Sequence, residues 1–302
     1  MIKALSGTVA AYWSAMMRGP PPPLNTSSKW EGEARPALVV AKDLQKLILK
    51  LKGEFITEDG TGVDYGAMRS SDLFKQYCDA TRELQCVDIL EMVQAEDEVK
   101  CFFINIYNAL TIHGLTQGSN LPTSPLMFMG GRFWTSTKYQ VGEFVLSLDD
   151  IEHGILRGNS VHPSTKVKCF SEDDARCKLV VKEVDPRIHF ALVCGAKSCP
   201  PIRVFTANNL EFGLSAAAKN FCESETSLTK DEAGHVTIEL SQLLQWYGGD
   251  FGDGEVEVLR RIVAYMGETE DRKTIEECLA TEPPLKNATI TYKKYNWELN
   301  MK

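Results

Sequence analysis

Hydrophobic residues recur along most of the chain with the spacing of helices. Between Pro36 and Gly53, apolar residues return every three or four positions, which is typical of a helix with one buried face. The same spacing predicts further helices at about residues 70–80, 83–94, 97–115, 147–157, 206–224 and 254–267. Short apolar or alternating runs predict strands at about residues 138–145, 188–194, 235–240 and 288–293. We therefore expect a helix-rich α+β protein with a small mixed sheet.

The first 35 residues do not share this pattern. Met1–Met17 is apolar enough for a short helix, but Arg18–Leu24 contains four consecutive prolines, which form a stiff spacer. We expect residues 1–35 to be an arm or linker. No Pro/Gly-rich linker interrupts the later chain, so residues 36–302 are expected to form a single globular domain.

Composition narrows the classes of protein to consider. The chain has 302 residues, of which 43% are hydrophobic and 25% charged, enough for a sizeable core. Its net charge of −8 opposes binding to phosphate backbones, so no nucleic-acid partner is expected. No apolar run reaches the roughly eighteen residues of a membrane span. The nine cysteines lack the dense spacing of a disulfide framework, which favours free thiols in the cytoplasm.

The segment Asp185–Ile202 holds the greatest density of reactive groups. Its apolar run predicts a buried strand at 188–194, with His189 near the start and Cys194 at the end. Two prolines follow Cys199, and a central strand cannot contain them because they lack the N–H of the sheet ladder. We therefore expect Cys199 on a turn at the carboxyl end of the strand, where α/β proteins usually bind ligands.

Together with two earlier segments, this one resembles the family called domain of unknown function 547. The three segments occur in the family's order and are Cys101-Phe-Phe-Ile-Asn-Ile-Tyr-Asn-Ala-Leu-Thr-Ile-His-Gly114, Leu146-Ser-Leu-Asp-Asp-Ile-Glu-His-Gly-Ile-Leu-Arg157 and Asp185–Ile202. The family's tail is matched at Trp246-Tyr247…Asp250-Phe251 and Tyr295-Asn-Trp-Glu-Leu-Asn300, with Asn296 where the family usually has aspartate. The resemblance is strongest over residues 80–225, and it implies a fold without implying a reaction.

The helix of the first motif carries Asn105 and Asn108 on one face among Phe, Ile and Tyr. Two amides on such a face are expected to be buried. We favour the interpretation that they bind the backbone of neighbouring loops, because an unpaired buried polar group costs about 1–3 kcal/mol. The alternative is that one of them orients a histidine, as an asparagine does in papain-like enzymes.

The second motif offers Glu152 and His153, followed by Arg157. His153 and Arg157 are four residues apart and share a helix face, and the arginine disfavours a charged imidazole. Glu152 lies in a helix that begins with Ser147-Leu-Asp-Asp150, where the helix dipole already favours acidic residues. A structural role is therefore the simpler interpretation, and a place in a reactive site is the alternative.

Two cysteines are candidate nucleophiles, and a third lies in the same motif as one of them. Cys101 follows Lys100 near the start of its helix, and both features lower a thiol pKa. A cysteine that opens a helix and a later histidine on a strand are also the layout of papain-like and transglutaminase-like hydrolases. Cys199 is expected to be accessible, with Lys197 and Arg203 favouring its thiolate, whereas Cys194 is expected to be an inert core thiol.

Metal and redox chemistry are weaker alternatives. His153, His189, Cys194 and Cys199 are zinc-binding types, but two cysteines separated by four residues, with no second pair, depart from the usual zinc pattern. The same spacing is a poor match to a C-x-x-C redox site. The glycine-rich run Gly248–Gly254 lacks the lysine of a nucleotide-binding loop. We therefore expect neither a metal nor a cofactor.

Two hypotheses of function remain. The first is a thiol-dependent hydrolase or acyl transferase, with Cys199 or Cys101 as nucleophile, His189 or His153 as base, and Asn105 or Asn108 orienting the histidine. The second is a non-catalytic adaptor that binds a protein partner through an exposed aromatic tail around Tyr295 and Trp297.

Overall fold

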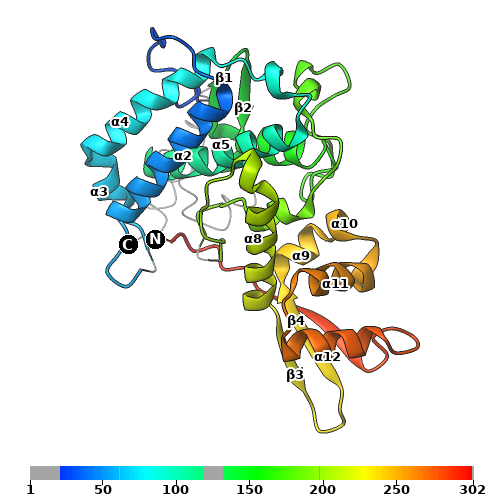
Figure 1. The fold of residues 1–302 in the computed structure, drawn as a ribbon. Helices are drawn as coiled ribbons and strands as arrows, with labels where there is room; N and C mark the ends of the chain where they lie inside the picture. The colour runs from blue at the N-terminus through cyan, green and yellow to red at the C-terminus, as the bar shows by residue number, and fades with distance from the viewer. Residues whose placement is uncertain (1–20, 61, 118–131, 197, 301–302) are drawn as a thin grey trace, which may run out of the picture.

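The computed structural model describes residues 21–60, 62–117, 132–196 and 198–300. Figure 1 shows two parts, a larger one above and a smaller one below, with helix α8 running from one toward the other. The four longer elements of the larger part are α2 (Ala37–Glu54), α3 (Tyr65–Ser70), α4 (Asp72–Thr81) and α5 (Glu96–Gln117). Its short elements are η1 (Arg82–Cys86), η2 (Leu90–Met92), α7 (Arg132–Ser136), β1 (Lys138–Val141), β2 (Phe144–Ser147), η3 (Asp150–Leu156), η4 (Ala175–Leu179), η5 (Pro186–Phe190) and η6 (Ala207–Asn209).

The smaller part contains a three-stranded sheet covered by helices. Its elements are α8 (Leu210–Glu225), β3 (Ser227–Lys230), β4 (Val236–Ser241), α9 (Gln242–Trp246), α10 (Gly248–Phe251), α11 (Gly254–Tyr265), α12 (Glu270–Leu279) and β5 (Ala288–Lys293). Strand β4 pairs antiparallel with β3 and parallel with β5, so the sheet is mixed, while β1 and β2 form a separate antiparallel hairpin. The predicted helix-rich α+β class with a small mixed sheet is confirmed.

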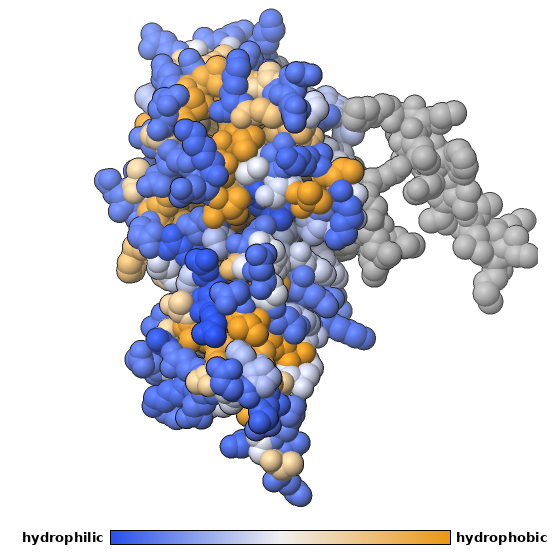
Figure 2. Space-filling model, turned by 90° about the vertical axis from the view of Figure 1, so that its right-hand side faces the viewer, coloured by the Kyte–Doolittle hydropathy of each residue, from blue (hydrophilic) through white to orange (hydrophobic). Residues whose placement is uncertain are grey.

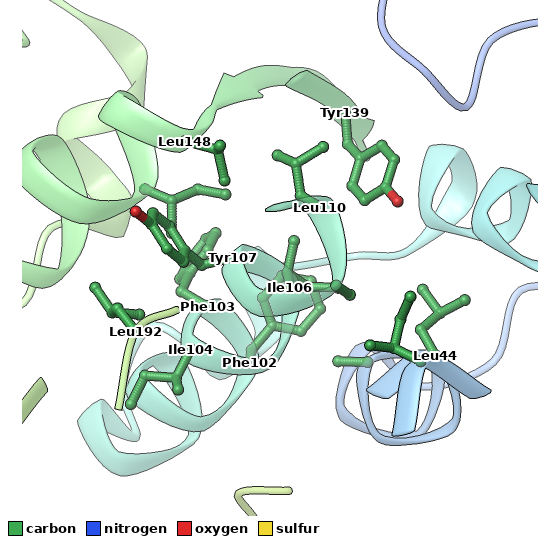
Figure 3. Close-up of a cluster of buried hydrophobic side chains, with 14 of the residues drawn as sticks. Leu44, Phe102, Phe103, Ile104, Ile106, Tyr107, Leu110, Tyr139, Leu148 and Leu192 are labelled. Atoms are coloured by element: carbon green, nitrogen blue, oxygen red, sulfur yellow. The ribbon is translucent and has the colours of Figure 1, made fainter. Parts of the chain in front are cut away.

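Helix α5 is the centre of the larger part. Nearly every residue from Val99 to Thr116 is buried, including the polar ones, so the helix is enclosed on all sides. Figure 3 shows side chains from α5, among them Phe102, Ile106 and Leu110, packed between Leu44 of α2 and Tyr139 of β1. A helix held this firmly can position polar side chains with little freedom.

The buried hydrophobic side chains form two clusters, and α8 contributes to both. Leu210 and Leu214 belong to the cluster around α5, whereas Ala217, Ala218, Phe221 and Cys222 belong to the cluster under the sheet. Two further residues link the two parts. Phe190 of η5 packs into the second cluster, and Leu299, near the end of the chain, packs into the first. Apolar surface is visible on both parts in Figure 2, with a more polar band between them.

The described part of the predicted arm is packed on the body. Residues 21–35 contain turns but no helix or strand. The Asn25 side chain is 1% exposed, accepts from the Gln140 N–H at 2.9 Å and donates to the Gln140 carbonyl at 2.8 Å. Met1–Met17 lies outside the described residues, and the single domain over 36–302 stays a prediction. No described helix combines the length and the apolar character needed to cross a bilayer.

The predicted strand at 188–194 is wrong. Pro186–Phe190 is a 3₁₀ helix, and Asp185 caps it by accepting the Arg187 N–H at 3.0 Å. A short apolar run does not distinguish a buried strand from a buried helical turn, and the Asp-Pro pair at its start is a helix-initiation signal. The chain beyond Ala191 is then fixed by α5 through Asn108, which substitutes for a sheet partner.

Three other predicted elements differ in detail. The helix predicted at 83–94 is two separate 3₁₀ turns, η1 and η2. The strand predicted at 138–145 is the β1–β2 hairpin, which turns at Gly142 with a φ of 53°. The helix predicted at 147–157 is present but becomes a π-helix from Asp150. Neither a 3₁₀ nor a π segment changes the apolar spacing enough to be predicted from it.

The π-helix η3 requires a glycine at position 154, which gives a testable prediction. A Cβ atom at Gly154 would lie 2.3 Å from the Cζ atom of the buried Phe170 ring. We expect Gly154→Ala to lower the free energy of unfolding by about 1–3 kcal/mol through overpacking, although alanine is about 1 kcal/mol better in a helix. Urea unfolding followed by circular dichroism measures this change.

The matched control is Gly53→Ala in α2. A Cβ atom at Gly53 meets nothing within 4 Å, so the same substitution is expected to stabilise the protein by up to about 1 kcal/mol. Equal stabilisation by both substitutions would show that η3 does not pack on Phe170 as described.

Candidate functional site

A buried ion pair lies between the two hydrophobic cores. Arg157, at the end of η3, binds Asp250 of α10 through both carboxylate oxygens, with Nε–Oδ2 at 2.6 Å and Nη2–Oδ1 at 2.8 Å. The Nε2 atom of His189 donates to the same Oδ2 at 2.7 Å. Burial opposes ionisation of Asp250, but the hydrogen bonds from His189 and Arg157 hold the pKa of this carboxyl well below its usual range.

Glu152 is the second buried carboxylate of this cluster. It accepts hydrogen bonds from the hydroxyls of Tyr107 on α5 at 2.7 Å and Tyr247 at 2.8 Å. Burial opposes its ionisation, yet the nearby His153 and His189 together with the two hydroxyls lower the pKa of Glu152. Tyr247 also stacks on His189, with ring centroids 4.0 Å apart. This residue of the smaller part therefore contacts both Glu152 of the second motif and His189 of the third.

The π-helix explains why Glu152, His153 and Arg157 converge. The Arg157 N–H donates to the Glu152 carbonyl at 2.9 Å, five residues earlier, so the turn is wider than in an α-helix. Arg157 Nη1 also donates to Nδ1 of His153 at 3.0 Å. Burial is the main cause that lowers the pKa of His153 to about 3, so its imidazole is neutral, as the sequence predicted.

One group of side chains has the composition of a metal site. Potential ligand atoms of Asp149, His153 and His162 lie within 4.8 Å of one another. Burial, followed by the negative charges of Glu152 and Asp150, raises the pKa of Asp149 to about 7. The four zinc-binding types named from the sequence do not form such a group among the described residues.

The hydrogen bonds of the two histidines do not fit a metal. Nδ1 of His153 accepts from Arg157, and Nδ1 of His162 accepts from the Ser164 N–H at 3.0 Å. Each neutral ring therefore carries its proton on Nε2 and has no lone pair left for a cation. The adjacent guanidinium also repels positive charge.

Both asparagines of α5 bind backbone. Asn105 accepts the Phe205 N–H at 3.0 Å and donates to the Phe205 carbonyl at 2.7 Å. Asn108 accepts the Val193 N–H at 2.8 Å and donates to the Ala191 carbonyl at 3.0 Å. Neither amide hydrogen-bonds a histidine in the described structure. Their contacts are those of the first interpretation, in which the amides bind the backbone of neighbouring loops. Asn108 fixes the chain between His189 and Cys194.

Cys194 and Cys199 meet at a second cluster with Tyr295. The Cys194 N–H donates to Sγ of Cys199 at 3.1 Å, and the Tyr295 hydroxyl lies 3.3 Å from Sγ of Cys194 and 3.5 Å from Sγ of Cys199. Burial raises the pKa of Cys199, but the hydrogen bonds from Cys194 and Tyr295 outweigh it and lower the pKa to about 7. The pKa of Cys194 is raised well above its ordinary value, first because its thiol hydrogen-bonds Cys199.

Cys199 lines a pocket of about 160 Å³ between the loop and α8. The apolar wall of the pocket is formed by Phe190, Pro200, Pro201, Ala217 and Phe221. Its polar groups come from Ser198, Arg203, Asn220, Ser224 and Glu225. Arg203 lines the pocket but is not among the causes that lower the pKa of Cys199, and Lys197 lies outside the described residues. The charge of Lys52 on α2 also interacts with Cys199.

The C-terminal tail holds the cysteine loop in place. Ala196 forms a β-bridge with Leu299, and the Asn300 N–H donates to the Gly195 carbonyl at 3.0 Å. Gly195 has a φ of 86°, and a Cβ there would lie 2.3 Å from Leu115, so the position needs glycine. The Asn296 N–H donates to Oγ of Ser198 at 3.3 Å, a contact that does not need the aspartate found in the family at this position.

The expectation that Cys101 ionises easily is wrong. Cys101 is fully buried in α5, and burial, together with the charges of Asp97 and Glu98, raises the pKa of its thiol to about 12. Lys100 lies near Glu96, with Nζ–Oε1 at 3.5 Å. Burial, followed by the acidic residues of the first turn, thus outweighs the helix dipole at this position.

The described structure separates the predicted thiols from the predicted bases. Cys194 and Cys199 do not hydrogen-bond a histidine among the described residues; His189 binds Asp250 instead. A thiol–histidine contact occurs at Cys78 and His113, with Sγ–Nε2 at 3.5 Å. Burial raises the pKa of Cys78 to about 12 and lowers that of His113 to about 3, so this pair is a neutral core contact.

Three polar residues of these clusters, Tyr107, Tyr247 and Asp250, were not predicted as site residues. Tyr295 was predicted to contact a protein partner and not the two cysteines. The signal was present, because Tyr107 lies in the first motif and the other three lie in the two tail segments that resemble the family. Their partners are far away in sequence, and no spacing rule connects them.

Residues 91–222 match the model of the family described as a protein of unknown function, DUF547. This confirms the resemblance expected from the motifs. Glu152, His189, Cys194 and Cys199 lie within the matched segment, whereas Tyr247, Asp250 and Tyr295 follow it. Comparisons with curated proteins and with solved structures found no match.

The buried histidines predict a loss of stability in acid. His113 and His153 both have a pKa of about 3 because of burial, compared with about 6.5 in an unfolded chain. Their contribution is complete above pH 6.5 and is lost as the pH falls toward 3, because unfolding then takes up two protons. Between about pH 6 and 5 these two histidines together lower the free energy of unfolding by about 2.7 kcal/mol per pH unit. Asp149, whose pKa is raised to about 7 by burial, releases a proton on unfolding in this range and offsets about half of that slope.

Urea unfolding at several pH values measures this slope. His153→Gln retains an acceptor for Arg157 and is expected to reduce the slope by about 1.4 kcal/mol per pH unit. Gly53→Ala, which changes no titratable group, is the control and is expected to leave the slope unchanged. An unaltered slope in His153→Gln would contradict a neutral, buried His153.

Proposed function

We propose that this chain is a thiol-dependent hydrolase or acyl transferase in which Cys199 is the nucleophile. One observation carries the proposal. A cysteine whose pKa is lowered to about 7 lines a pocket formed by a proline-stiffened loop and a helix. A thiolate is the reactive form of cysteine, and the lowered pKa increases the fraction of Cys199 that carries it at neutral pH.

The nucleophile is activated by hydrogen bonds and not by an adjacent base. The Cys194 N–H, the Cys194 thiol and the Tyr295 hydroxyl all favour the charged form of Cys199. Such activation through a lowered pKa is an established alternative to a cysteine–histidine pair. His189 therefore has a positioning role in this proposal, because its ring is held by Asp250 and Tyr247.

The reaction follows from these contacts. The Cys199 sulfur attacks an acyl carbonyl carbon, a thioester bond forms, and the bond to the leaving group breaks. The leaving group takes a proton from the Tyr295 hydroxyl or from water. Burial and the neighbouring thiols raise the pKa of Tyr295 well above its ordinary value, so Tyr295 retains a proton to donate. Water or an acceptor amine or alcohol then releases the acyl group and restores the thiol.

The adaptor alternative is less well supported. It depends on an exposed aromatic tail, but Tyr295 and Trp297 are half-buried and pack against each other and Trp246. The ring centroids of Trp246 and Trp297 are 5.3 Å apart. These aromatic side chains support the cysteine loop and leave little surface for a partner.

The location of the protein follows from the same proposal. All nine cysteines are thiols in this structure. Because a nucleophilic Cys199 must stay reduced, we propose that the protein works in a reducing compartment such as the cytoplasm.

Alkylation by iodoacetamide tests the proposal directly. The rate at Cys199 is expected to rise through a midpoint near pH 7, compared with about 8.5 for an unperturbed thiol. Tyr295→Phe removes one hydrogen bond to the thiolate and is expected to raise this midpoint by about one unit. Peptide mapping by mass spectrometry measures the rate at each cysteine separately.

Cys86→Ser is the matched control, because Cys86 is exposed and lies far from the loop in sequence. It is expected to leave the rate at Cys199 unchanged. If Cys199 reacts only in denaturant, or if the pH midpoint of its alkylation equals that of an ordinary thiol, the proposed nucleophile is rejected. The adaptor alternative then becomes the better-supported function.

A further inference from the structure

Cys194 and Cys199 form a pair of unequal thiols. The thiol of Cys194 hydrogen-bonds the sulfur of Cys199, and the same Tyr295 hydroxyl contacts both sulfurs at 3.3 and 3.5 Å. The pKa of Cys199 is lowered, whereas that of Cys194 is raised well above its ordinary value. One member of the pair is thus poised to react, and the other remains protonated beside it.

We propose that this pair is an oxidative modification site, in which a hydroperoxide converts Cys199 into a disulfide with Cys194. The inference rests on the proposed reactivity of Cys199, and it adds a second reaction at the same sulfur. It concerns a redox state of the protein and does not require that any acyl substrate be known.

The reaction proceeds in two balanced steps. The Cys199 thiolate attacks the outer oxygen of the hydroperoxide, the O–O bond breaks, and water or an alcohol leaves after it takes up a proton. Sulfur is oxidised to sulfenic acid and the peroxide is reduced. The Cys194 sulfur then attacks the sulfenic sulfur, an S–S bond forms, and the Cys194 proton leaves with the hydroxyl as water.

The geometry favours Cys194 as the resolving partner. The sulfur of Cys199 hydrogen-bonds the thiol of Cys194, whereas Cys78 contacts His113 and Cys101 is buried in α5. The tail residues Leu299 and Asn300 hold Ala196 and Gly195, the two residues that follow Cys194. Disulfide formation removes the thiolate, so the proposed acyl transfer at Cys199 stops. It also protects Cys199 from irreversible oxidation.

The positions of the tryptic sites allow a disulfide between Cys194 and Cys199 to be detected directly. Trypsin cleaves after Arg187, Lys197 and Arg203, so the two cysteines fall on separate peptides, 188–197 and 198–203. We expect stoichiometric hydrogen peroxide, added to the reduced full chain, to join these two peptides by a bond that dithiothreitol breaks. The intact protein should lose two hydrogen atoms in mass.

Variants separate the steps. Cys194→Ser is expected to abolish the linked peptides and to leave a Cys199 sulfenic acid that dimedone traps, with several-fold more sulfinic acid at higher peroxide. Cys199→Ser is expected to leave Cys194 unoxidised. Cys86→Ser is the control and should give the same yield of linked peptides as the unmodified chain.

The outcomes distinguish this inference from the proposed function. Rapid alkylation of Cys199 without linked peptides would overturn the disulfide and leave the nucleophile intact. Slow alkylation and no linked peptides would overturn both. Linked peptides that survive in Cys86→Ser but vanish in either loop variant support the modification site, whether or not an acyl substrate is found.

Discussion

The ion pair between Arg157 and Asp250 is the contact on which the arrangement of the site depends. Both side chains are almost fully buried, at 5% and 8% exposure, and their chain neighbours Leu156 and Phe251 belong to different hydrophobic clusters. A charge in such a place is tolerated when its partner is present, and the loss of one partner leaves the other desolvated and unpaired. The pair therefore specifies how the smaller part docks on the larger part, more than it adds stability.

The chemistry of the thiols follows from that docking. When Asp250 is held by Arg157, α10 brings Tyr247 onto His189 and Glu152. Asn108 binds the chain between His189 and Cys194. The C-terminal tail places the Tyr295 hydroxyl in contact with the sulfurs of Cys194 and Cys199. The buried cluster around Arg157 and Asp250 thus has a structural role, and it sets the geometry of the neighbouring loop that carries the reactive Cys199. This division explains why the histidine and cysteine of one short motif do not touch.

The sequence predicted the elements with strong periodicity and missed those defined by distant partners. The helix around Asn105 was predicted because its apolar residues and amides repeat with helical spacing, and the burial of Asn105 and Asn108 followed from their neighbours. The strand at His189 was wrong because six apolar residues fit either a strand or a tight helical turn. The π-helix could not be predicted either, since one extra residue per turn barely alters the pattern.

The candidate site was predicted in part for the same reason. Glu152, His153 and His189 were named from their types and motif positions, but Asp250 lies 61 residues beyond His189, and its role depends on tertiary packing. The behaviour of Cys199 was expected from neighbouring cations, yet the described structure lowers its pKa mainly through hydrogen bonds from Cys194 and Tyr295. Local sequence identifies reactive residue types, whereas their protonation depends on partners brought together by folding.

A double-mutant cycle on Arg157 and Asp250 tests this account most directly. The free energy of unfolding is measured by urea denaturation for Arg157→Met, Asp250→Asn and the double variant. Breaking the pair from either side is predicted to cost about 3–5 kcal/mol, and the double variant should lose clearly less than the sum, with a coupling energy of about 2–3 kcal/mol. Strictly additive losses would mean that the two side chains do not depend on each other, and that the pair does not join the two parts of the protein.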